Sequence, residues 1–181
     1  MALSATMRKF EISLADSDRG VYEELAWRVA QHPSESERHL VARVLARVLE
    51  HGEGLDFSKG GVSDDVEPAL VQRDLRGDLV AWIEIGSPSP DRLHKATKLC
   101  KHVVVYAWKN PEELAAAITE RETHRAEDIV LNVLDPEVLD AAAAKLDRNN
   151  VWNIAVTGGA LYLTIGDLVL ETAVRRIHVA G

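Results

Sequence analysis

The sequence predicts a mixed α/β protein (mixed α+β) in which helices flank a central mixed β-sheet. Amphipathic helical patterns alternate with short apolar runs along the chain, and no linker separates them. In the middle of the chain the order is helix, strand, hairpin, helix, strand, which is typical of a mixed sheet with helices packed on it. With 181 residues, of which 46% are hydrophobic, we expect one domain spanning residues 1–181.

Composition excludes several classes of protein. No apolar run approaches the roughly 20 residues that cross a bilayer, and the N-terminus MALSATMRKF lacks the apolar core of a signal peptide. The single cysteine, Cys100, has no second cysteine with which to form an internal disulfide, so we expect a cytoplasmic protein. A net charge of -8 argues against a generally basic nucleic-acid-binding surface but leaves room for a local basic patch.

The first third of the chain predicts one strand and two helices. Ser4–Leu14 alternates apolar and polar residues as a half-buried strand does. Tyr22–Val29 has a short helical pattern that stops near His32-Pro33. The strongest helix begins at Pro33 in PSESE, because an apolar stripe recurs at helical spacing. The stripe comprises Leu40, Val41, Val44, Leu45, Val48 and Leu49.

A hairpin and a capped helix are predicted next, after a short strand at Leu55–Ser58. Asp74–Gly77 suits a type I turn and joins Ala69–Arg73 to an apolar strand, Leu79–Gly86. Ser89-Pro90 opens the following helix with serine as N-cap. The remaining predicted elements are a strand at Val103–Trp108, a helix opened by Asn110-Pro111 in the same way, a strand at Ile129–Val133, a helix opened by Asp135-Pro136, and three strands within Val151–Val179, the first two joined by Gly158-Gly159.

One carboxylate stands out from this pattern. Leu79–Gly86 reads LVAWIEIG, an unbroken apolar run with Glu84 near its end. Such a run predicts a strand buried on both faces. An ionised carboxylate there is costly unless a cation, a metal ion or a set of hydrogen-bond donors compensates its charge. Glu84 therefore needs a partner.

The hairpin suggests one neighbour for this carboxylate. If Asp74 and Asp78 flank the turn, antiparallel pairing sets Glu84 opposite Pro68 and brings Glu67 to the mouth of the hairpin beside it. Strict alternation turns Glu67 to the other face, although a bulge or a one-residue slip would correct this. Two carboxylates at a strand end suit Mg²⁺. The alternative is that Glu67 is an ordinary loop acid.

Four short motifs, in this order and at this spacing, resemble the YaeQ family of small bacterial proteins. They are HPSE at 32–35, EP at 67–68, WIEIG at 82–86 and R-x-x-K-A at 92–96. The resemblance runs from the ALSAT start to the C-terminal strands. It implies a variation on the PD-(D/E)XK nuclease fold, a restriction-endonuclease-like core with extra C-terminal strands. That core has the element order described above.

The resemblance implies a metal site. Glu67 resembles the acid on the first hairpin strand and Glu84 the acid of the (D/E)XK half-motif, and together they would bind Mg²⁺. The backbone carbonyl of Ile85 would add a third ligand. A lysine would orient or activate the water that attacks a phosphodiester.

This sequence departs from the pattern at that lysine, because Gly86 stands in its place. Lys95 on the following helix is the best substitute, since members of the wider superfamily move the lysine to that helix. Arg92, one turn earlier, would project from the same face. Without such a substitute the site is a remnant.

The early helix can contribute a third acid, as it often does in related nucleases. Ser34-x-x-Glu37 has the pattern of a capping box, which gives Glu37 a structural role. Glu35 has no such role and is the better functional candidate. Asp64 and Asp65, in the loop before the hairpin, either reach the site or are simply solvated.

Three classes of function remain open. The first is a Mg²⁺-dependent nuclease or other phosphodiesterase that uses Glu67, Glu84 and Lys95. The second is a catalytically inactive module of nuclease fold that binds a nucleic acid or a protein, with a role linked to transcription. The third is a structural or interaction protein in which Glu84 is a fossil neutralised by Lys95. No histidine spacing suggests zinc, and no glycine-rich motif suggests a dinucleotide.

Overall fold

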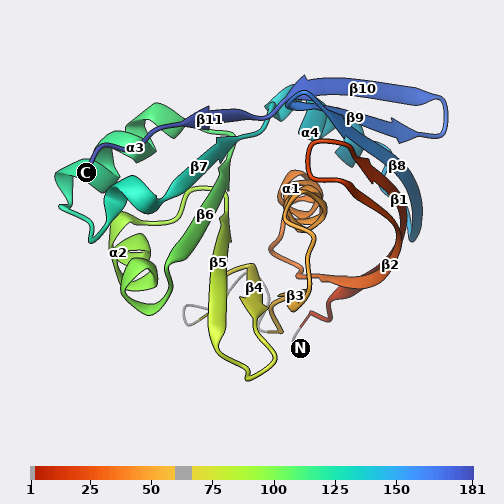
Figure 1. The fold of residues 1–181 in the computed structure, drawn as a ribbon. Helices are drawn as coiled ribbons and strands as arrows, with labels where there is room; N and C mark the ends of the chain where they lie inside the picture. The colour runs from red at the N-terminus through yellow and green to blue at the C-terminus, as the bar shows by residue number, and fades with distance from the viewer. Residues whose placement is uncertain (1–2, 60–66) are drawn as a thin grey trace. The chain divides into compact units, whose positions relative to one another are not determined.

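The computed structural model describes residues 3–59 and 67–181, and the chain divides into two compact units. Met1–Val41 and Leu134–Val174 form the first unit; Ala42–Val133 and Arg175–Gly181 form the second. Each unit contains one mixed sheet (Figure 1). The protein is thus mixed α/β as predicted, but its strands form two mixed sheets rather than one central sheet. A single domain over residues 1–181 stays a prediction.

The sheet of the first unit has the strand order β10-β9-β8-β1-β2. β1 is antiparallel to β2 and parallel to β8, so strands from the two ends of the unit's sequence lie side by side. Phe10 packs edge-on against Trp152, with ring centroids 5.1 Å apart, at the centre of this unit's core. The strands are β1 (Thr6–Asp16), β2 (Val21–Gln31), β8 (Asn149–Thr157), β9 (Ala160–Ile165) and β10 (Leu168–Ala173).

The helix predicted at Tyr22–Val29 is wrong, because this segment lies within β2. Leu25, Trp27 and Val29 are the more buried residues, and exposed residues alternate with them. Leu25 and Val29 are four residues apart, a spacing that puts two side chains on one face of either a helix or a strand. Full pairing with β1, from Thr6 with Gln31 to Asp16 with Val21, selects the strand.

The sheet of the second unit has the order β11-β7-β6-β5-β4-β3. Its central strands β5, β6 and β7 are parallel, and the β4–β5 hairpin is antiparallel. The C-terminal segment forms four strands instead of the predicted three: β8, β9 and β10 belong to the first unit, and only β11 joins this sheet. The strands are β3 (Leu55–Phe57), β4 (Leu70–Arg73), β5 (Leu79–Ile85), β6 (His102–Ala107), β7 (Val130–Val133) and β11 (Arg175–Ile177).

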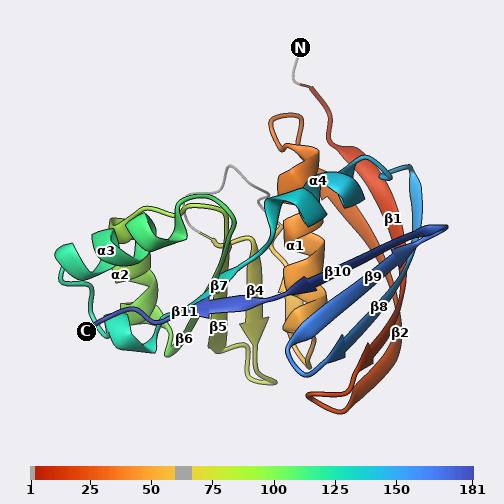
Figure 2. The same ribbon diagram turned by 90° about the horizontal axis from the view of Figure 1, so that it is seen from above.

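Helices α2 and α3 cover one face of this second sheet (Figures 1 and 2). Leu93 from α2 and Ile118 from α3 pack with Trp82, Val105 and other strand residues in one apolar cluster. None of the helices in the described parts of the chain is long and apolar enough to cross a membrane. The helices are α1 (Glu37–Leu49), α2 (Pro90–Leu99), α3 (Pro111–Glu120), α4 (Pro136–Ala143) and a 3₁₀ turn, η2 (Ala126–Asp128).

The predicted starts of α2, α3 and α4 are confirmed, but α1 begins at Glu37 and not at Pro33, and two of the predicted caps are wrong. Ser89 accepts a hydrogen bond from the Arg92 amide, as an N-cap does. Asn110 makes no such cap: its backbone is left-handed, with φ of 44°, and its side chain donates to Glu113 instead. At α1 the cap is Ser36 rather than Ser34, because the Ser36 hydroxyl accepts from the His39 amide.

A histidine on β6 carries a shifted pKa. Nε2 of His102 lies 4.0 Å from a carboxylate oxygen of Glu50, whose other oxygen accepts a 2.7 Å hydrogen bond from the Tyr106 hydroxyl. This interaction with Glu50 raises the pKa of His102 and outweighs the opposing effect of partial burial. The charged pair therefore stabilises the fold fully below the unfolded-state pKa of about 6.5, and this contribution is lost as pH rises through the folded-state pKa.

We expect Glu50→Gln to lower the pKa of His102 back toward about 6.5, because the compensating negative charge is gone. A proton NMR titration of the histidine C–H signals measures this directly, with Glu53→Gln as a charge-matched control that leaves Glu50 in place. An unchanged His102 pKa in Glu50→Gln would contradict the assignment of the shift to this carboxylate.

Candidate functional site

The candidate site centres on Glu84 near the end of β5. Glu84 is 6% exposed and lies two residues after Trp82, so both side chains point to the sheet face that α2 covers. Val105 of β6 pairs with Glu84 on the parallel side of the strand. An ionised carboxylate buried against apolar neighbours requires compensation.

Arg92 in the first turn of α2 supplies that compensation. Its Nε forms a short charge-assisted hydrogen bond with Glu84 Oε1, and the Trp82 indole donates to the same oxygen at 2.8 Å. The Arg92 guanidinium also lies over the Trp82 ring, 5.8 Å from its centroid. The side chains of Arg92 and Glu84 are 23% and 8% exposed, so this ion pair is largely shielded from water.

The same guanidinium ties Glu67 to the site. Arg92 Nη2 donates to the backbone carbonyl of Glu67 at 2.6 Å. Sequence reasoning set Glu84 opposite Pro68, but a register shift between Gln72 and Arg73 moves the pairing by one residue. Continued past Leu70, the observed register would place Ala69 opposite Glu84. Glu67, two residues before Ala69, then has the parity of Glu84, and the bulge considered from the sequence is the reason.

Gly86 ends β5 in a conformation that disfavours a lysine. Its φ is +96°, a region that glycine adopts readily and residues with a Cβ rarely do. Its amide donates to the Tyr106 carbonyl at 2.8 Å, which fixes the turn against β6. Ile85, the predicted carbonyl ligand, is buried and pairs with Tyr106 in the ladder. The position at which the half-motif has a lysine is thus occupied here by a glycine in a backbone conformation that favours glycine.

Lys95 does not neutralise Glu84; Arg92 does. Lys95 is exposed and carries its charge near Asp91, whose pKa is lowered chiefly by Arg121 and to a smaller degree by Lys95. The residues of α2 that face the sheet are Leu93, Ala96 and Thr97, all buried. Because α2 begins only a few residues after β5, its first turn is the part nearest the strand end. Arg92 is on that turn and Lys95 is one turn further along.

Glu35 is buried and has a partner of its own, His39. Its side chain is fully buried just before α1, and Oε1 lies 2.7 Å from Nδ1 of His39. Glu37, for which the capping box predicted a bond to the helix start, instead lies 3.4 Å from Arg8. Glu35 belongs to the first unit and Glu84 to the second. A shared role of these two acids stays a prediction.

Mg²⁺ binding by Glu67, Glu84 and the Ile85 carbonyl stays a prediction, and the bonds that Glu84 already makes weigh against it. A guanidinium and an indole already bond the Glu84 carboxylate, and a divalent cation beside it would lie against the charge of Arg92. Within residues 3–59 and 67–181, no group of three or more histidine, cysteine, aspartate or glutamate residues could hold a metal ion. Asp64 and Asp65 lie outside the described residues.

Sequence reasoning missed the part that Trp82 plays. Trp82 was expected to be only a core residue, and it does belong to the apolar cluster under α2. Its indole N–H nevertheless serves Glu84. The signal was present in the sequence, because residues two apart on a strand share a face and a buried indole needs an acceptor.

Comparisons with known proteins agree on one family. The model of the family described as "YaeQ protein" matches residues 1–174. Proteins named "Uncharacterized protein YaeQ" from Escherichia coli (strain K12) and Salmonella typhi are each 30% identical over 168 residues, which is 91% of this chain and 91% of the relative.

Two solved structures have the same fold. The crystal structure of YaeQ protein from Pseudomonas syringae is 29% identical with a TM-score of 0.87, and the match covers 98% of this chain and 97% of that one. The YaeQ protein from Xanthomonas axonopodis pv. citri is 28% identical with a TM-score of 0.88, covering 98% and 100%. On sequence and on structure, this chain belongs to the YaeQ family.

Proposed function

We propose that this protein acts by binding a partner and not by metal-dependent hydrolysis, and that Glu84 is the remnant of a nuclease metal site turned to structural use. The observation that carries this proposal is the buried ion pair of Glu84 with Arg92. A metal ligand at the end of a strand must present free oxygens to the ion. Here Oε1 accepts from two side chains at once.

The proposal includes descent from the PD-(D/E)XK nuclease fold. The order α1, β3, the β4–β5 hairpin, α2 and β6 is the order of that core, and the acid lies on the second hairpin strand as the half-motif requires. Nucleic acid is therefore the first partner to test, with a protein partner as the alternative. If partner binding does not require metal binding by the Glu84 carboxylate, wild type and Glu84→Gln will bind labelled DNA and RNA equally.

A Mg²⁺-dependent phosphodiesterase is the second candidate. One observation supports it: Arg92 bonds both the Glu84 carboxylate and the backbone carbonyl of Glu67, so the backbone of one predicted metal ligand is near the carboxylate of the other. This function requires Arg92 to leave the Glu84 carboxylate before an ion can bind. The substitute lysine would then be Lys95, which is exposed.

We expect Arg92→Ala to lower the free energy of unfolding by about 3 kcal/mol. The reason is that the variant leaves the buried Glu84 carboxylate without a counter-charge, while the partial exposure of Arg92 keeps the loss at the lower end of the usual range. Urea unfolding followed by tryptophan fluorescence measures the change. Lys95→Ala, on the same helix, is the control and should stay within about 0.5 kcal/mol of wild type. Equal stability of the two variants would show that Arg92 has no structural role.

We expect Mg²⁺ and Mn²⁺ to leave the melting temperature of the wild type unchanged, because Arg92 holds the position of the cation. In Arg92→Ala the same ions are expected to restore part of the lost stability by replacing the missing positive charge. Thermal unfolding with and without each ion tests this, with Arg92→Ala/Glu84→Gln as the control that removes the response. A metal-dependent rise in the wild type that Glu84→Gln abolishes, together with hydrolysis of an oligonucleotide, would instead establish the phosphodiesterase.

Restoring a side chain at position 86 should cost stability. Gly86→Ala is expected to lower the free energy of unfolding by about 1–2 kcal/mol, because the Cβ of alanine makes a backbone with φ of +96° strained. Urea unfolding again provides the measurement, and Gly77→Ala, at a positive φ in the exposed hairpin turn, separates the backbone effect from any effect of burial. No loss in Gly86→Ala would indicate that the turn after β5 relaxes freely.

A further inference from the structure

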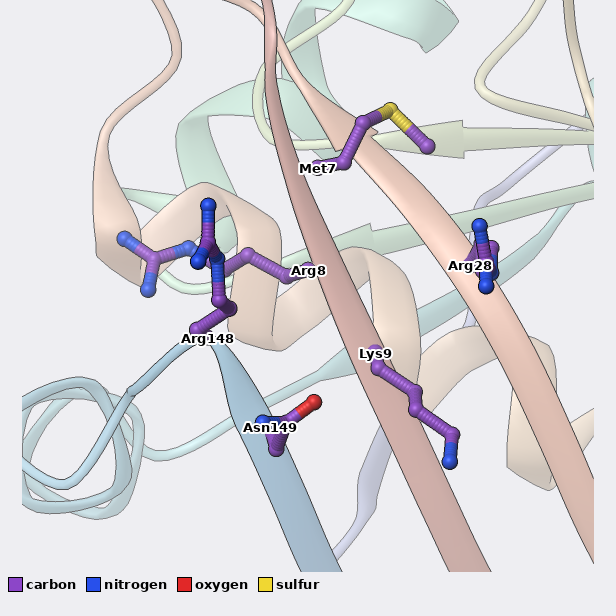
Figure 3. A pocket seen from close by; sticks show the side chains of 6 residues that line it. All are labelled: Met7, Arg8, Lys9, Arg28, Arg148 and Asn149. Carbon is purple, nitrogen blue, oxygen red and sulfur yellow. The ribbon is translucent and has the colours of Figure 1, made fainter.

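A basic pocket lies at one end of the sheet of the first unit. It has a volume of about 210 Å³ and is lined by Met7, Arg8, Lys9, Arg28, Arg148 and Asn149 (Figure 3). Four of these six residues are cations and none is an acid, although the chain as a whole has a net charge of -8. Such a concentration of one charge is typical of a site that attracts anions.

The strand register brings two of the cations directly together. Lys9 of β1 pairs with Arg28 of β2 on one side and with Asn149 of β8 on the other, so the three side chains form one row across the sheet. Like charges placed directly opposite each other on antiparallel strands destabilise the pair. The Lys9–Arg28 pair therefore carries a repulsion that a bound anion would relieve.

Arg28 and Arg148 have unused donors. Both residues are exposed, and within the described parts of the chain neither guanidinium forms a hydrogen bond or an ion pair. Lys9 has one partner, Glu11, at 2.7 Å, but both side chains are about half exposed and such surface pairs contribute little. The charged groups of Arg28, Arg148 and Lys9 are therefore available to an anion at small cost.

Arg8 is held in place by the protein, and its side chain leaves β1 on the opposite face from Lys9, toward Arg148 (Figure 3). Its guanidinium donates to the Gln31 side chain at 2.7 Å and to the Asp147 carbonyl at 2.9 Å, with a longer contact to Glu37 at 3.4 Å. A guanidinium has five N–H donors, so these bonds leave some of them available. A positioned arginine loses little entropy when it binds, which favours recognition of an anion with planar or tetrahedral oxygens.

We propose that this pocket binds a phosphate group. Guanidinium groups bind phosphate oxygens in bidentate geometry and an ammonium group adds a point charge, and the lining of the pocket has three arginines and one lysine. The phosphate can belong to a small molecule or to the backbone of a nucleic-acid strand, and Met7, 52% exposed at the rim, offers an apolar contact to either. This site uses no residue near Glu84, so a negative result here would leave the role proposed above for Glu84 unaffected.

The test compares two variants of equal charge. Arg28→Gln/Arg148→Gln removes the two unpaired pocket cations, and Arg76→Gln/Lys109→Gln removes two exposed cations of the second unit. Calorimetry with inorganic phosphate and with a nucleoside 5′-monophosphate measures small-molecule binding. Fluorescence anisotropy with a labelled single-stranded oligothymidylate measures strand binding.

The pocket variant is expected to weaken binding of at least one probe by about tenfold or more, while the control variant binds as wild type does. Tight binding of phosphate or the nucleotide identifies a small ligand. Binding of the oligonucleotide alone, with a salt dependence that the pocket variant reduces, identifies a strand. Thermal unfolding adds an independent readout, because loss of the Lys9–Arg28 repulsion should leave the melting temperature equal or higher.

Three results would overturn the proposal. The first is that none of the three probes binds the wild type. The second is an equal loss of affinity in both variants, which would assign binding to overall charge. The third is a lower melting temperature of the pocket variant without any change in affinity, which would give Arg28 or Arg148 a structural role.

Discussion

A buried carboxylate at the end of an apolar strand constrains everything around it. Glu84 needs a cation within bonding distance, and the chain supplies it from the first turn of the next helix. The Ser89 cap fixes where that turn begins, and Trp82, two residues before Glu84 on β5, adds a hydrogen-bond donor. Through the Glu67 carbonyl, the same guanidinium also anchors the segment that leads into β4. One ion pair thus joins a strand end, a helix start and a loop, which is why we assign it a structural role.

Net charge is a poor guide to local electrostatics in this protein. Arg92 at the candidate site is paired with Glu84. In contrast, Arg28 and Arg148 in the first unit are exposed, and their guanidinium groups have no partner in the described chain. Both arrangements occur in a chain of net charge -8. The two sites also differ in solvent exposure. The shielded Arg92–Glu84 pair is little screened by salt, whereas the electrostatic attraction of an exposed cluster extends over about a Debye length and weakens as the salt concentration rises. Ionic conditions therefore act more directly on the basic pocket than on the pair at Glu84.

Much of the fold could be predicted from the sequence where local signals were unambiguous. The apolar stripe of α1, the serine cap of α2 and the turn at Asp74 are each determined by a few neighbouring residues. The structure has all three at the predicted positions. Prediction failed where the deciding contacts were distant in sequence. Tyr22–Val29 has the spacing of both a helix and a strand, and only pairing with β1 decides. The choice of Arg92 over Lys95 depends on the distance between two packed elements, which periodicity alone does not contain.

The conformation of Gly86 has a consequence for how such a site changes over time. A lysine introduced there by a single substitution would meet backbone strain in a turn whose amide is already bonded to β6. It would also arrive beside an arginine that already neutralises the acid it is meant to assist. A lysine that serves Glu84 from this position therefore needs the turn, the helix start and the ion pair to change together. A single replacement of Gly86 by lysine thus gains neither a relaxed backbone nor a carboxylate that lacks a counter-charge.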